Sequence, residues 1–86
     1  KNIEPVVDSY LDNIENTTVY RYHYLDDNDA EFKRLGLILE ESPAEIVEPR
    51  GTSIELYAMS SYLWKGVQEL SAKVRQLEER IIQLEA

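Results

Sequence analysis

Cysteine is absent from this chain of 86 residues, so disulfide bonds and thiolate metal sites take no part in its fold. Glycine and proline occur only 3 times each, which leaves long stretches without a helix breaker. Basic residues are also few: 9 Lys and Arg against 17 Asp and Glu give a formal charge of −8. This field repels phosphate, so we expect neither nucleic acid nor an anionic membrane as a partner. No run approaches the roughly 20 apolar residues that span a bilayer.

A chain of this length forms one small domain that buries only a modest fraction of its surface. Oligomerisation is therefore an expected source of additional stability. The sequence opens on Lys1 rather than on Met, from which we expect a processed piece or an excised fragment of a longer protein.

Residues 1–52 predict a small α+β head. Apolar residues at helical spacing predict a helix of about three turns that has Pro5 in its first turn and ends near Asn16. The stretch TTVYRYHYL (17–25) is rich in β-branched and aromatic residues and predicts a strand. FKRLGLIL (32–39) predicts its hairpin partner across a polar loop, and we expect the apolar end, 37–39, to be buried on both faces.

Two sequences with the pattern of a helix capping box follow. Ser42-Pro43-Ala44-Glu45 predicts a short helical turn through Ile46. Thr52-Ser53-Ile54-Glu55 predicts the start of a long helix, which we place at residues 53–86 because no proline interrupts it. At 1.5 Å per residue this helix is about 50 Å long and must extend beyond the head. Its C-terminal part is therefore expected to pack on other chains.

The long helix carries a heptad repeat, with apolar residues separated by alternating steps of four and three from Leu63 onward. This spacing predicts a coiled coil from about residue 63, with the first predicted turns of the helix extending the register backwards. The a positions are Ser60, Val67, Val74 and Ile81, and the d positions are Leu56, Leu63, Leu70, Leu77 and Leu84.

Charges beside the repeat favour a parallel coiled coil. Lys73 and Arg80 occupy g positions, and Glu78 and Glu85 occupy the e positions that follow them. A g residue faces the following e residue of its neighbour in a parallel pair, so both contacts are attractive. The spacing alone leaves a dimer and a trimer open. A monomeric helix packed on its own head is a third reading, although the head is small for that purpose.

The order of these signals carries a family resemblance. "KNIEPV" opens the chain, "YRYHY" leads through a polar loop to "RLGLILEESPAEIV", and "SIELYAMSSYLWKGVQEL" runs into the coiled coil. This order resembles the C-terminal intramolecular chaperone domain of bacteriophage tail spikes, endosialidases and neck appendages (peptidase family S74). The resemblance covers nearly the whole chain and is strongest at Leu63–Leu70. It is weakest after Gly36, where Leu39-Glu40 stands in place of the usual Ala-Gln.

The resemblance implies a homotrimeric α+β head on a helical stalk, attached behind a β-structured fibre or tail spike of its own precursor. Such domains bring three fibre chains into register in the cytoplasm of the infected bacterium. They then release themselves by autoproteolysis and are absent from the mature virion. In the family a serine attacks the peptide bond before it, and a lysine five positions later is the general base. Lys1 matches that lysine, so the serine would lie upstream of this sequence, and the chain as given would be inactive.

Several other residues were candidates for a site. His23 is the single histidine and is expected to have a structural or surface role. Asp26, Asp27 and Asp29 lack the glycine and the final glutamate of an EF-hand loop and predict a solvated turn. Nothing in the sequence predicts a cofactor.

Aromatic and acidic residues left further alternatives. The alternating tyrosines at 20, 22 and 24 are expected to pack on a helix. Two weaker alternatives are a face that stacks on carbohydrate and a strand through which this chain binds a different partner. Trp64 lies next to the repeat and is expected to anchor the head to the stalk. Glu40 and Glu41 are expected as helix-cap groups or as interchain partners of Arg50 or Lys65, rather than as an acid–base pair.

Overall fold

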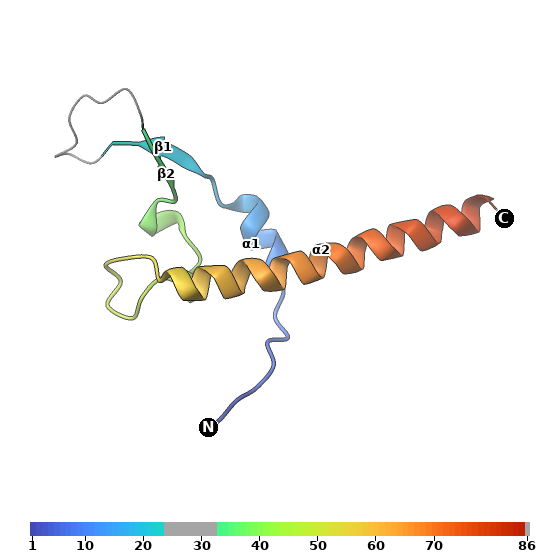
Figure 1. The fold of residues 1–86 in the computed structure, drawn as a ribbon, viewed down its shortest axis with the longest axis horizontal. Coiled ribbons are helices and arrows are strands. Elements are labelled where there is room, and N and C mark those ends of the chain that lie inside the picture. The colour runs from blue at the N-terminus through green and yellow to red at the C-terminus, as the bar shows by residue number, and fades with distance from the viewer. Residues whose placement is uncertain (24–32, 86) are drawn as a thin grey trace.

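A computed structural model describes residues 1–23 and 33–85. It places a small head on one end of a long helix, with principal extents of 60 × 41 × 16 Å (Figure 1). The predicted α+β class is confirmed, with a two-stranded antiparallel hairpin before a long C-terminal helix. The elements in chain order are α1 (Leu11–Asn16), β1 (Tyr20–Tyr22), β2 (Arg34–Gly36), the 3-10 turns η1 (Leu39–Glu41) and η2 (Ala44–Ile46), and α2 (Leu56–Glu85).

Helix α2 has 30 residues, which corresponds to about 45 Å, and its C-terminal half extends past the head (Figure 1). It begins at Leu56 rather than at the predicted Ser53. An isolated β-bridge between Val47 and Ile54 keeps Ile54 out of the helix. The Glu55 carboxylate then accepts hydrogen bonds from the free backbone N–H groups of Tyr57 and Ala58, at 2.9 and 2.7 Å. The predicted end, Ala86, lies outside the described residues.

The hairpin pairs Tyr20 with Gly36 and Tyr22 with Arg34. Gly36 accommodates the ring of Tyr22, because a Cβ at this position would meet the ring and hydroxyl at 3.1 Å. The prediction that residues 37–39 are buried on both faces is wrong. Ile38 is 37% exposed and Leu39 begins η1, since a sheet of two strands has no further layer to cover both sides. Residues 24, 25 and 32 of the predicted strands lie outside the described residues.

The predicted N-terminal helix is correct at its end, Asn16, and wrong at its beginning. Residues 1–8 are exposed and non-helical, and α1 begins only at Leu11. Ile3 and Val7 are 92% and 89% exposed, so the first half of the segment has no apolar surface against which to pack. A short amphipathic segment without such packing is not stable as a helix in water.

The predicted turn through Ile46 is present as η2, but Ser42 does not cap it. The Ser42 hydroxyl instead donates to the carbonyl of Ile38, at 2.8 Å, and so closes η1. Within the described part of the chain, the buried apolar side chains are Leu11, Ile46 and Tyr62. They come from α1, η2 and α2, so these three elements form the centre of the head.

Candidate functional site

The most extensive candidate surface is the heptad repeat of α2. Its apolar residues are between 44% and 84% exposed in the single chain, and Ser60 is exposed as well. The head lies over the first half of α2, whereas the C-terminal half projects beyond it (Figure 1), and residues 71–85 are all exposed. A row of large apolar side chains exposed along one face is the feature expected of a protein–protein contact.

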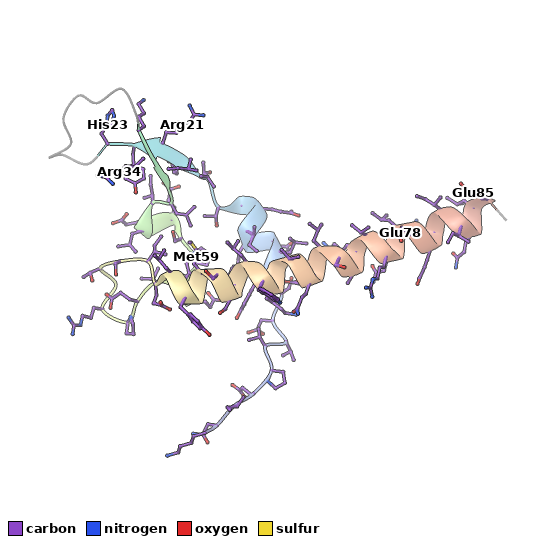
Figure 2. The ribbon with its side chains drawn as sticks, viewed as in Figure 1. Arg21, His23, Arg34, Met59, Glu78 and Glu85 are labelled. Atoms are coloured by element: carbon purple, nitrogen blue, oxygen red, sulfur yellow. The ribbon has the colours of Figure 1, made fainter. Side chains whose placement is uncertain are left out.

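The predicted charged positions flank this row on the projecting part of α2. Lys73, Glu78, Arg80 and Glu85 are all exposed, and Figure 2 shows Glu78 and Glu85 well away from the head. They are therefore accessible to a second chain. The structure places all of the predicted interface residues on one helix, α2.

A second face of α2 holds the head. Tyr62, 4% exposed, stacks on Tyr10 with ring centroids 3.9 Å apart and an interplanar angle of 5°. Its hydroxyl accepts a hydrogen bond from the Asn13 side-chain amide at 2.9 Å, and burial raises the pKa of this hydroxyl. One turn further along, a Cβ on Gly66 would overlap Cδ1 of Ile14. The glycine therefore permits α1 to approach α2 closely.

Glu69 fixes the segment that leads into α1. Its carboxylate accepts hydrogen bonds from the Ser9 hydroxyl and from the backbone N–H of Tyr10, the latter at 2.8 Å. These two hydrogen bonds hold the pKa of Glu69 below its ordinary value, and the bond from the Ser9 hydroxyl has the larger effect. The charged carboxylate thus attaches the start of α1 to α2.

Acidification is expected to loosen α1 from α2. Because the pKa of Glu69 is lowered in the folded chain, the contribution of its carboxylate is complete above the ordinary value of 4.5. It is lost as the pH falls from that value through the lowered pKa. The near-ultraviolet circular dichroism of the stacked tyrosines should decrease across this range, and Glu69→Gln should lower the signal at neutral pH and remove the acid transition.

Glu48→Gln is the matched control for this prediction. The Glu48 carboxylate accepts hydrogen bonds from the hydroxyl and backbone N–H of Thr52, at 2.7 and 2.9 Å, and its pKa is also lowered. It lies in the turn before α2, so its replacement should leave the α1 transition in place. An acid transition that persists in Glu69→Gln would show that another group controls the docking of α1.

Trp64 does not anchor the head, contrary to the sequence-based prediction. It is 72% exposed, and Tyr62 makes the contacts that were expected of it. The sequence feature that could have identified Tyr62 is a second row of residues along the same helix, at positions c and g of the heptad rather than a and d. It consists of Met59, Tyr62, Gly66 and Glu69.

The remaining candidates lie apart from one another. Lys1 is exposed at the tip of the extended N-terminal segment, and His23 is exposed directly after β1. Glu41 accepts a hydrogen bond from the Tyr20 hydroxyl at 2.8 Å, which raises the pKa of that tyrosine. Within the single chain its partner is thus a tyrosine of the hairpin.

No group of three His, Asp or Glu side chains in residues 1–23 and 33–85 is arranged to hold a metal ion. The predicted turn with Asp26, Asp27 and Asp29 lies outside these ranges. Over the same ranges, no helix combines the length and apolarity that a membrane crossing requires. Comparison of the chain with protein-family models, with curated proteins and with solved structures gives no match.

Proposed function

We propose that this chain is a self-association module: an α+β head whose α2 helices join in a parallel, homotrimeric coiled coil. The observation that carries the proposal is the uncovered heptad repeat, at least 44% exposed at every apolar position. The head supports it indirectly, because three buried apolar side chains among the described residues form a small core for a chain of this length. Burial of the repeat between copies supplies the missing apolar contact.

The parallel arrangement follows from the charges beside the repeat. Lys73 of one copy faces Glu78 of the next, and Arg80 faces Glu85, when the helices run in the same direction. An antiparallel arrangement would bring e against e and g against g, and so place like charges together. Parallel helices also put all heads at one end of the stalk.

We further propose that the module is an intramolecular chaperone for a phage fibre or tail spike that precedes it in a longer chain. A trimeric β-fibre depends on non-local pairing between chains, which is slow and prone to errors of register. A head that associates first raises the effective concentration of the fibre strands. The order of motifs from "KNIEPV" to "LWKGVQEL" supports this role.

Release by autoproteolysis just upstream of Lys1 completes the proposal. A lysine serves as general base only as the neutral amine, which requires burial or a neighbouring cation. Lys1 is exposed in the single chain, so the proposal requires upstream residues or a neighbouring copy to supply that environment in the precursor. The alternative is a coiled-coil module that stays attached to a fibrous protein; the exposed repeat supports this equally.

The test is the intact mass of a longer chain that carries this domain behind its own upstream segment. Two products, with the smaller one beginning five residues before Lys1, are expected, and Lys1→Ala should abolish the cleavage. Lys33→Ala is the matched control, because Lys33 is an exposed lysine of the hairpin and should not affect it. A single uncut mass from a trimer would favour the attached module, and a dimer in sedimentation would contradict the trimer.

A further inference from the structure

The two flanks of the heptad repeat differ near the head. On the g and c side, Met59 is partly covered, Gly66 and Tyr62 are buried, and α1 and η2 pack there. On the e side, Tyr57 and Trp64 are 81% and 72% exposed. Each chain therefore has one flank that its own head covers and one flank that it leaves open.

The covered flank borders an apolar groove of about 960 Å³ between the hairpin, the 3-10 turns and α2. Met59 lines it from α2 and points toward the head (Figure 2). Two d residues of the repeat, Leu56 and Leu63, line the groove as well. The groove is thus continuous with the face through which the helices are proposed to associate, and its opposite wall includes Ile46 of η2.

The heptad register specifies what lies opposite Met59. In a parallel coiled coil a g residue faces the e residue five positions later in the neighbouring chain. For Lys73 and Arg80 these are the glutamates described above. For Met59 the corresponding residue is Trp64, so the single tryptophan of the chain meets the side of the neighbour that carries the groove.

We propose that Trp64 of one copy packs into the apolar groove of the next copy, against Met59. This inference rests on the proposed parallel self-association and holds for a dimer as well as a trimer, because the g-to-e relation is common to both. A methionine adapts its shape to an aromatic ring and makes favourable sulfur–ring contacts. Buried tryptophans are among the residues that contribute most at protein interfaces. The contact makes the heads, as well as the stalks, part of the interface.

Within its own chain, Trp64 has a weaker alternative to the contact with a second copy. A shallow hollow beside it is bordered by Pro5 and Val6 of the N-terminal segment. With Trp64 72% exposed and Val6 49% exposed, this contact leaves most of the indole in water. It is also independent of protein concentration, which separates it from a contact between copies.

The first test measures tryptophan fluorescence and sedimentation on the same dilution series. The chain has 1 Trp, so its emission reports on Trp64 alone. The emission should move to shorter wavelength as the mass rises from monomer to oligomer. Met59→Gln should reduce this shift, and Trp64→Ala should weaken association by about tenfold or more.

The second test uses the absence of native cysteine. A chain with Met59→Cys and Trp64→Cys should form disulfide-linked oligomers on mild oxidation. Two Cα atoms five residues apart on one helix are separated by more than the roughly 7 Å that a disulfide tolerates, so the bond must join two copies. The control pairs Met59→Cys with Gln68→Cys, which places the second thiol at position b, away from the neighbour, and should remain uncrosslinked.

The outcomes of the two tests separate the proposed Trp64 contact from the proposed self-association of the chain. Oligomers with an unshifted emission and no disulfide between positions 59 and 64 would overturn the Trp64 contact and leave the proposed function in place. A chain that remains monomeric at all concentrations would overturn both.

Discussion

Replacing Leu77 with lysine is expected to convert the oligomer to monomers. Leu77 occupies a d position on the part of α2 that projects beyond the head, and it is 56% exposed in the single chain. Loss of its packing in the coiled coil costs about 2–5 kcal/mol per copy, and burial of an unpaired ammonium adds to this. Even the lower value weakens association by about thirtyfold. Sedimentation equilibrium measures the effect directly.

Ile82→Lys is the matched control for this substitution. Ile82 is an apolar residue of the same helical segment and is 66% exposed, but it occupies position b. The two variants have the same net charge and the same new residue, so a general effect of charge or helix propensity would appear in both. Equal dissociation by both variants, or by neither, would contradict the a/d interface.

Replacing Tyr62 with alanine is expected to unfold the head while α2 retains its helical signal. The side chain is 4% exposed, stacks on Tyr10 and accepts the hydrogen bond from Asn13. Removal of a buried aromatic side chain destabilises a fold by about 3–5 kcal/mol. A head of this size has a total stability of the same order. Urea unfolding followed by near-ultraviolet circular dichroism should therefore lose its cooperative head transition.

Two further variants divide this effect into its parts. Tyr62→Phe keeps the stacking and loses only the hydrogen bond, so we expect a cost of about 1 kcal/mol. Tyr57→Ala removes an 81% exposed tyrosine from the same helix and should leave the head intact. A head that survives Tyr62→Ala with its transition unchanged would show that the stability lies elsewhere.

Sequence periodicity predicted the elements whose pattern is long or strongly biased. The long heptad stretch without proline predicted α2 to within three residues at its start and one at its described end. The segment rich in β-branched and aromatic residues predicted the first strand of the hairpin. For the site, it predicted which face of α2 is apolar, because that face is a property of residue spacing alone. The identity of the chain that covers this face is not encoded in the spacing.

The errors arose where tertiary contacts override a local pattern. Residues 52–55 match the pattern of a capping box, yet the bridge between Val47 and Ile54 keeps Ile54 out of the helix and the Glu55 carboxylate caps α2 instead. The position of Trp64 next to the repeat predicted it as the anchor, whereas in the structure Tyr62 makes this contact. The positions of α1 and η2 decide which stripe of α2 the head covers, and α1 is held there by Tyr10 and Glu69.

Gly66 has a consequence for the order in which the molecule folds. A glycine within a helix lowers helix stability by about 1 kcal/mol relative to alanine, and Gly66 lies under Ile14 of α1, with the C-terminal stalk beyond it. The N-terminal section, residues 56–65, is shorter than the roughly 12–15 residues that persist as an isolated helix in water. We therefore expect helix growth to start in the stalk and to pause at the glycine. Growth then crosses the glycine into residues 56–65, and Ile14 packs over Gly66 only afterwards, so the docking of α1 would be the last cooperative step.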